Sequence, residues 1–305
     1  MGTLFRVKLY AASAEQAQSG FRLAFARVET LDNILSDYKP ESELSRVTTL
    51  AVGRPVTVSA DLFHVLVAAQ QISEETAGAF DVTLGPVIRL WREARKTGRP
   101  PSPDALREAA RFCGYKKMKL GAKDNTVEFE QAGMKLDLGG IAKGYAADEA
   151  LVVLNKNGIK SALVAASGDL AFGDPPPGKK GWSIGIDSFD SARAPFTKTL
   201  VLANSAVSTS GDTEQYLDAG GKHYSHIIDP ASDMGLTRRM TVTVVARRGL
   251  AADPFATAVD VMGAERGLAF IERQTEAAAL IIVREGAAPR TIESTRFQRL
   301  PVQAN

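Results

Sequence analysis

The chain has 305 residues, of which 45% are hydrophobic and 24% charged, as in an ordinary globular protein. Its formal net charge of +2 gives no strong field for nucleic acid or an anionic membrane. The single cysteine, Cys113, excludes an internal disulfide, and no run of 18 apolar residues predicts a membrane-spanning helix. We interpret Cys113 as a core or helix-end residue, and the basic segments 92–99 and 115–119 as solvated surface.

The first half of the chain predicts one strand followed mainly by helices. Residues 3–10 alternate as a strand does, and apolar residues at helical spacing follow. Ser59 and Ser102 are typical N-caps, and Pro103 suits a first helical position. A hairpin is expected where 126–130 and 134–138 flank a Gly-containing turn. Helices are predicted over 13–38, 59–78, 102–114 and 141–156.

The second half predicts mostly strands. One further helix is expected to start near Asp253, with Asp253 as its cap and Pro254 in its first turn. We find no repeats, and strands and helices mix without regular alternation, which favours an α+β fold over a doubly wound parallel sheet. Strands are predicted over 161–166, 182–187, 197–204, 207–211, 224–229, 240–246 and 277–285.

Two nucleotide-binding patterns are excluded. Residues 173–180, GDPPPGKK, nearly fit a P-loop, but three prolines remove backbone N–H donors and Lys180 replaces the magnesium-binding hydroxyl. We therefore interpret the segment as a surface turn. The chain contains no G-x-G-x-x-G, so no dinucleotide fingerprint is present.

Residues 137–148, DLGGIAKGYAAD, predict an anion site at the start of a helix. Gly139 and Gly140 let the backbone approach a ligand, and the helix N-terminus offers free N–H groups. Lys143 lies in the first turn, where the helix dipole disfavours a cation, so a phosphate facing it would explain its position. The alternative is an ordinary strand-to-helix turn with a solvated lysine.

Three other segments leave alternatives open. Asp253 and Thr257 are four residues apart on one helical face and could supply hard oxygens to Mg²⁺, although Asp253-Pro254 is also an ordinary helix start. Residues 78–91, with Phe80, Asp81 and Trp91, form either an irregular core segment or a loop against a planar ligand. The segment HYSH, 223–226, lacks the spacing of a helical zinc pair.

Together these segments resemble one family, the ApbE-type FAD:protein FMN transferases, formerly described as thiamin-biosynthesis lipoproteins. The resemblance runs through most of the chain in family order. It rests on Met1-Gly2-Thr3, DYKPESELSRV (37–47), GAFDVTLGP (78–86), DLGGIAKGYAAD (137–148), SGDL (167–170), STSGD (208–212), YSHIIDP (224–230) and ADPFATAVDVMG (252–263).

The resemblance implies the fold, the reaction and the site. It implies one ApbE-type domain over residues 1–305, related to the T-fold, with mixed or antiparallel sheets and the FAD cleft between two subdomains. It implies Mg²⁺-dependent transfer of FMN from FAD to a Ser/Thr hydroxyl of an acceptor flavoprotein through a phosphoester, with release of AMP. The residues so implied are Met1, Tyr38, Ala79, Phe80, Asp81, Asp137, Lys143 and Ile227 for FAD, Gly140 (through its carbonyl), Asp253 and Thr257 for Mg²⁺, and His226 as a base.

Three departures from the family pattern bear on acceptor specificity more than on FAD binding. Ser167-Gly168 stands where two glycines are common, ASDMG follows HIIDP where the family has a shorter Thr-Gly turn, and Pro254 follows Asp253. An FAD pyrophosphatase, giving FMN and AMP, and a non-catalytic FAD-storage protein remain alternatives.

The resemblance also implies partners and a location. The implied acceptor carries a Ser/Thr flavinylation motif, as an electron-transport subunit or an exported flavoprotein, and no nucleic acid is expected. The implied location is periplasmic or membrane-associated, with a leader absent from this chain, and a cytoplasmic location is the alternative.

Overall fold

The structure is a computed structural model and describes residues 2–187, 196–211, 215–285 and 288–303. The chain divides into two compact units, which we describe one at a time. The first unit contains Leu31–Ala142 and Gly211–Arg238, and the second contains Gly2–Thr30, Lys143–Ser210 and Arg239–Asn305. The single domain of residues 1–305 with an FAD cleft between subdomains stays a prediction.

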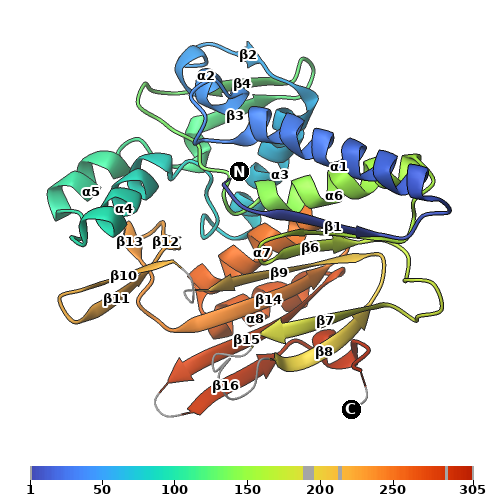
Figure 1. Cartoon of the computed structure of the whole chain (residues 1–305). Helices are drawn as coiled ribbons and strands as arrows, with labels where there is room; N and C mark the ends of the chain where they lie inside the picture. The colour runs from blue at the N-terminus through green and yellow to red at the C-terminus, as the bar shows by residue number, and fades with distance from the viewer. Residues whose placement is uncertain (1, 188–195, 212–214, 286–287, 304–305) are drawn as a thin grey trace. The chain divides into compact units, whose positions relative to one another are not determined.

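The second unit is built on a seven-stranded sheet with the strand order β1-β5-β6-β9-β14-β15-β16 (Figure 1). Within this sheet the pairs β1–β5, β5–β6, β6–β9, β14–β15 and β15–β16 are antiparallel, in agreement with the predicted α+β class. The strand β14 is buried at every residue, which is typical of a strand covered on both faces. The strands are β1 (Phe5–Leu9), β5 (Ala162–Ala166), β6 (Asp169–Phe172), β9 (Ser205–Gly211), β14 (Met240–Ala246), β15 (Ala277–Glu285) and β16 (Ala288–Glu293).

Helices and a separate hairpin cover this sheet. The helix α7 packs on β14 and α8 on β15, and Phe255 of α7 meets Phe270 of α8 edge-on with ring centroids 5.2 Å apart. A second apolar cluster around Trp182 and Phe297 joins the hairpin β7–β8 to the sheet. The elements are α1 (Ala14–Leu35, which ends in the first unit), α6 (Ala142–Lys156, whose first residue is in the first unit), α7 (Gly249–Met262), α8 (Ala264–Arg273), β7 (Trp182–Asp187), β8 (Phe196–Leu202) and η2 (Phe297–Arg299).

The first unit combines short helices with three small sheets. Its apolar cluster is centred on Trp91 of α4, whose ring lies 5.1 Å from that of Tyr224. Ser59 and Ser102 cap α3 and α5 as predicted, each accepting a hydrogen bond from a backbone N–H three residues on. The elements are α2 (Glu43–Leu50), α3 (Ala60–Glu75), α4 (Gly85–Thr97), α5 (Pro103–Ala110), η1 (Tyr115–Lys117), β2 (Val56–Thr57), β3 (Met118–Gly121), β4 (Thr126–Phe129), β10 (Tyr216–Ala219), β11 (Lys222–Ser225), β12 (Ile228–Asp229) and β13 (Met234–Gly235).

Two predicted strand arrangements are wrong. The strand β4 pairs with β3 and β2, whereas residues 134–138 form only a single bridge, from Lys135 to Leu84. The predicted strand 224–229 is two strands, because β11 pairs with β10 whereas β12 pairs with β13. Both outcomes depend on strand partners that a local pattern does not reveal.

The start of α7 also differs from its prediction. The helix begins at Gly249, one turn before Asp253, and Pro254 lies inside it. The carboxylate of Asp148 accepts hydrogen bonds from the backbone N–H groups of Gly249 at 2.8 Å and Leu250 at 3.0 Å. This cap comes from another helix and stabilises the extra turn, so Asp253 is not the cap of α7.

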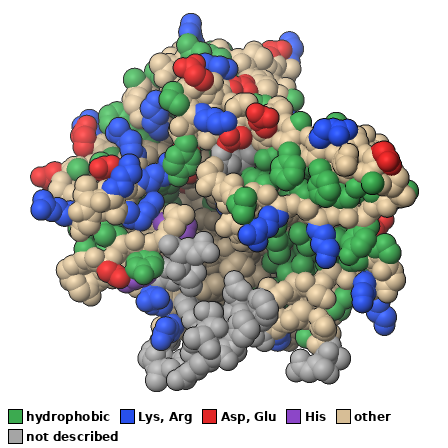
Figure 2. Space-filling model, in the orientation of Figure 1, with side chains coloured by type: hydrophobic (Ala, Val, Ile, Leu, Met, Phe, Trp, Pro, Cys, Tyr) green, Lys and Arg blue, Asp and Glu red, His purple; other side chains and the backbone are tan. Residues whose placement is uncertain are grey.

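The basic segment 92–99 is only partly the solvated surface that we expected. Lys96 and Arg99 are exposed, and Figure 2 shows Lys and Arg side chains gathered over the region that α4 and α5 occupy in Figure 1. Arg92, however, is half-buried and forms ion pairs with two carboxylates.

No helix in the described part of the chain combines the length and the apolar character needed to cross a membrane.

Candidate functional site

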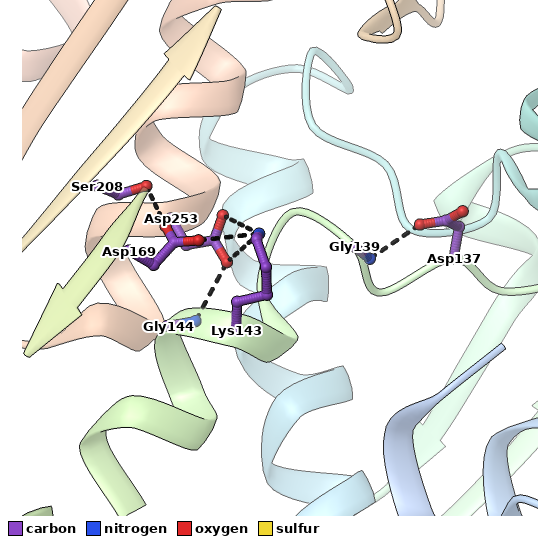
Figure 3. Close-up of polar contacts among 7 residues, drawn as sticks. All are labelled: Asp137, Gly139, Lys143, Gly144, Asp169, Ser208 and Asp253. Carbon is purple, nitrogen blue, oxygen red and sulfur yellow. Dashed lines mark hydrogen bonds and ion pairs between the residues drawn. The ribbon is translucent and has the colours of Figure 1, made fainter. Parts of the chain in front are cut away.

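The most concentrated group of charged side chains in the second unit surrounds Lys143. Its ammonium lies 3.0 Å from Oδ2 of Asp169 and 3.2 and 3.3 Å from Oδ2 and Oδ1 of Asp253 (Figure 3). Both carboxylate side chains are 5% exposed. The lysine comes from the first turn of α6, Asp169 from β6 and Asp253 from α7. We call these three residues the lysine–carboxylate cluster.

The cluster is completed by two hydrogen bonds to its carboxylates. The hydroxyl of Ser208 on β9 donates to Oδ1 of Asp169 at 2.5 Å, and Asp169 and Ser208 are register partners of the β6–β9 pairing. The backbone N–H of Gly144 donates to Oδ2 of Asp253 at 3.2 Å. Both carboxylates are therefore oriented by groups other than Lys143.

A close crossing of α6 and α7 makes this arrangement possible. A Cβ on Gly144 would lie 2.1 Å from the carbonyl oxygen of Gly249, and a Cβ on Gly249 would lie 2.4 Å from that of Gly144. Only glycine fits at such a contact between backbones. The crossing brings the start of each helix to an aspartate of the other, Gly144 to Asp253 and Gly249 to Asp148.

Burial governs the protonation of this cluster. Desolvation raises the pKa of Asp253, and the neighbouring Asp169 raises it further, while Lys143 and the Gly144 N–H oppose the rise. For Lys143, burial alone would lower the pKa, but the two carboxylates outweigh it and the pKa is raised. The lysine is therefore charged at neutral pH.

A second polar group lies in the first unit around Asp137. Its Oδ1 accepts from the backbone N–H of Gly139 at 2.8 Å (Figure 3). Its Oδ2 accepts from Arg92 at 2.5 Å. Arg92 also pairs with Asp37, and its guanidinium lies 4.3 Å from the ring centroid of Tyr38, which is 63% exposed. The predicted FAD residues Tyr38 and Asp137 therefore meet at Arg92.

The segment 78–91 belongs to the core of the first unit. Phe80 and Trp91 are buried, and Ala79 is half-buried. Asp81 accepts hydrogen bonds from the backbone N–H and hydroxyl of Thr83 and from the backbone N–H of Tyr115. Burial raises its pKa, and these bonds oppose the rise. A role of Ala79, Phe80 and Asp81 in FAD binding stays a prediction.

His226 lies just after β11 in the first unit and is half-buried. Its Nδ1 lies 3.2 Å from the carbonyl oxygen of Gln215, which can only accept, so this contact fits a neutral ring with the proton on Nδ1 and the lone pair on Nε2. The neighbouring Ile227 is buried, 6% exposed. His223 contacts Asp218 instead, with Nδ1 to Oδ1 at 2.7 Å, so the two histidines have different surroundings.

The predicted metal residues are only partly brought together. Asp253 and Thr257 both lie in α7, as predicted, with Asp253 buried and Thr257 half-buried. Gly140 belongs to the first unit, so its place in a shared site stays a prediction, and Met1 lies outside the described residues. Across the described ranges, no three His, Cys, Asp or Glu side chains form a metal-binding group.

The chemistry of the second unit nevertheless fits a hard divalent cation. Asp253 and Asp169 offer carboxylate oxygens and Thr257 a hydroxyl, which are the hard oxygen ligands that Mg²⁺ prefers. Mg²⁺ usually takes one or two carboxylates from a protein and completes its shell with water and phosphate oxygens. A site with few protein ligands is thus what this ion requires.

Sequence reasoning missed four features of these groups. Asp169 and Ser208 lay in the noted motifs SGDL and STSGD but received no role, and Arg92 was taken as surface. The fourth feature is a short repeated pattern. Gly-x-Ala-Ala-Asp occurs at 144–148 and again at 249–253, each time after a basic residue. The expectation of no repeats is therefore wrong at this length, and the repeat marks the helix crossing.

The fold and the two polar groups define a class of protein before any relative is considered. An α+β fold carries a lysine–carboxylate cluster at the start of a helix, with an ammonium that could face a phosphate and carboxylates that could face a hard cation. These features fit the class of proteins that bind a phosphate-bearing ligand.

Comparison with known proteins assigns the family. The model of the ApbE family matches residues 1–281. The FAD:protein FMN transferase of Treponema pallidum is 32% identical over 298 residues, which cover 92% of this chain and 82% of that protein. The chain belongs to the ApbE family.

Solved structures agree with this assignment. The flavin transferase ApbE from Vibrio cholerae matches with a TM-score of 0.88 at 27% identity, covering 98% of this chain and 96% of that one. The apo flavinyl transferase ApbE of Pseudomonas stutzeri matches with a TM-score of 0.85 at 30% identity, covering 98% and 94%. The predictions of the family, of the α+β fold and of an enzyme of the flavin-transferase class are confirmed.

Proposed function

We propose that this enzyme transfers FMN from FAD to a serine or threonine hydroxyl of an acceptor flavoprotein, with Mg²⁺ as cofactor and AMP as the second product. The observation that carries the proposal is the lysine–carboxylate cluster, in which Lys143 and Asp253 meet at the start of α6. Family membership and the relatives' names support flavin transfer from FAD.

In this proposal Lys143 and the α6 N-terminus face the pyrophosphate of FAD. Phosphoryl transfer depends mainly on positioning and on neutralisation of charge, and the half-buried ammonium of Lys143, held by two carboxylates, would supply both. Asp253 and Thr257, with the carbonyl of Gly140, would hold Mg²⁺. When bound, this ion would neutralise charge on the pyrophosphate.

The first unit contributes the flavin contacts of the proposal. Tyr38 presents an exposed ring, and Arg92 holds both this ring and the carboxylate of Asp137. Met1, Ala79, Phe80, Asp81 and Ile227 are the further proposed contacts to FAD. Because Asp137 also binds the Gly139 N–H, the same carboxylate would fix the shape of the glycine turn before Lys143.

His226 is the proposed general base. The acceptor oxygen attacks the FMN phosphorus, the bond from this phosphorus to the oxygen bridging to AMP breaks, and the hydroxyl proton passes to Nε2 of His226. Nε2 carries the lone pair because Nδ1 faces the carbonyl of Gln215. The products are a phosphoester-linked FMN and AMP.

One assay tests this function against its two alternatives. The protein is incubated with FAD and Mg²⁺, with or without an acceptor domain that carries a Ser/Thr flavinylation motif, and AMP and acceptor mass are measured. AMP that requires acceptor, with one FMN of added mass, is the expected result. AMP without acceptor would indicate an FAD pyrophosphatase, and bound FAD without AMP a storage protein.

A pair of histidine variants tests the base. His226→Ala should abolish transfer while FAD still binds, and His223→Ala is the matched control because its imidazole faces Asp218. Unchanged transfer by His226→Ala would remove His226 from the mechanism.

The acceptor class, an electron-transport subunit or exported flavoprotein, and a periplasmic or membrane-associated site of action are proposals that rest on the family resemblance.

A further inference from the structure

We propose that Asp169 is a positioning residue that keeps Lys143 in place when the carboxylate of Asp253 binds a divalent cation. The inference rests on the proposed function, because it takes Asp253 as the metal-binding carboxylate. It assigns a role to a residue that neither the motif analysis nor the family comparison singles out.

The ammonium of Lys143 and a divalent cation would compete for one carboxylate. Lys143 lies within 3.3 Å of both oxygens of Asp253, and Oδ2 also accepts from the Gly144 N–H. A metal ion needs at least one of these oxygens. Lys143 must therefore give up part of its contact with Asp253 when a metal ion binds.

Asp169 is built to remain with the lysine. Its Oδ1 accepts from Ser208 and its Oδ2 faces Lys143, so each oxygen has its own partner. The register pairing of β6 with β9 fixes Ser208 opposite Asp169, and both side chains are buried. The orientation of Asp169 therefore does not depend on Asp253.

The energetic argument follows from the cost of an unpaired buried charge. If Asp169 were absent, a lysine displaced from Asp253 would lose its ion pairs with both carboxylates of the cluster in a largely desolvated place, which is strongly unfavourable. The lysine would then stay on Asp253 and oppose the metal ion. With Asp169 present, the ammonium keeps one ion pair at 3.0 Å.

Calorimetric titration of the protein with Mg²⁺, without FAD, tests this role. Asp169→Asn keeps the acceptor for Ser208 but removes the charge facing Lys143, and we expect Mg²⁺ to bind at least ~10-fold more weakly. Adding Lys143→Met should restore binding to within ~3-fold of the wild type, because the competitor is gone. Exposed Glu265 in α8 gives the matched control, Glu265→Gln, which should bind as the wild type does.

Each other outcome overturns the proposal in a distinguishable way. Asp169→Asn with unchanged Mg²⁺ affinity would show that Asp169 does not act on the metal site. A double variant as weak as Asp169→Asn would make Asp169 a metal ligand rather than a positioning residue. A wild-type protein that binds no Mg²⁺ either alone or with FAD present would overturn the metal site of the proposed function, and the inference with it.

A milder substitution covers the case in which Asp169→Asn does not fold. Ser208→Ala removes the hydrogen bond to Oδ1 of Asp169 and leaves its charge. We expect a weakening of Mg²⁺ binding in the same direction by ~2- to 5-fold, as for loss of one charged hydrogen bond. An affinity equal to that of the wild type would show that the orientation of Asp169 has no effect.

Discussion

Residues 144–148 and 249–253 share the pattern Gly-x-Ala-Ala-Asp, yet their aspartates have different surroundings. Within the described part of the chain, the carboxylate of Asp148 accepts hydrogen bonds from two backbone N–H groups at the start of α7 and from no side chain. Asp253 accepts one such donor from α6 and also faces Lys143, beside Asp169. One copy of the pattern is a helix cap and the other is a cap combined with a charged site.

The basic residue before each glycine explains the difference. Lys143 precedes Gly144 and is held among buried carboxylates, whereas Arg248 precedes Gly249 and is exposed. We infer that the helix crossing itself is structural. Lys143 and Asp169 of β6 add a charged site on one side of it.

Replacing the two basic residues should have very different effects on activity. We expect Lys143→Met to lower the rate of AMP release by about 10²- to 10³-fold, because a preorganised charge at the pyrophosphate is lost. Arg248→Met, the matched control, should stay within about 2-fold of the wild type, because an exposed charge acts weakly through water. Equal losses in the two variants would contradict the distinction between site and scaffold.

Replacing the two glycines should have similar effects on stability. In Gly144→Ala and Gly249→Ala the new Cβ meets a backbone carbonyl at 2.1 and 2.4 Å, and the helices must move apart. We expect each to lower the free energy of unfolding by about 1–3 kcal/mol, measured by urea denaturation. A loss in only one variant would show that the crossing is not reciprocal.

The contribution of the Asp148 cap to stability should depend on pH. Burial raises the pKa of Asp148 from 3.8 to about 6, and its hydrogen bonds to Leu250 and Gly249 oppose the rise. The folded protein thus holds this proton more tightly than the unfolded chain, so the contribution of Asp148 to stability falls as the pH rises from about 4 to about 6.

The matching measurement compares the wild type with Asp148→Asn by urea denaturation across this pH range. The free energy of unfolding of the wild type minus that of the variant should decrease by about 1–2 kcal/mol between these pH values and stay level above them. A difference that does not vary with pH would mean that Asp148 has the same pKa in the folded and unfolded protein.

The sequence predicted most elements whose signals are local. Ser59 and Ser102 cap their helices as expected, and the strands β1, β5, β14 and β15 lie within a few residues of their predicted ranges. An N-cap serine three residues before the N–H that it binds, or an alternation of apolar residues in a strand, can be recognised in the sequence without knowledge of the fold. The α+β class followed from these elements.

The sequence failed where the partner lies far along the chain. It placed the start of α7 at Asp253 because Asp-Pro is a strong local cap, but Asp148, 101 residues before Gly249, caps the helix earlier. It paired residues 134–138 with β4, whose actual partners are β3 and β2. Pairing energies between distant segments decided both cases.

The sequence by itself identified Lys143 and Asp253 as candidate site residues, because a lysine at a helix start and an Asp-x-x-x-Thr face are unusual local patterns. Only the tertiary structure decided what they contact. Two glycines let α6 and α7 cross at backbone contact, and the β6–β9 register sets Asp169 and Ser208 beside the lysine. An ion pair across 110 residues has no local signature, because it forms only when packing has already brought its members together.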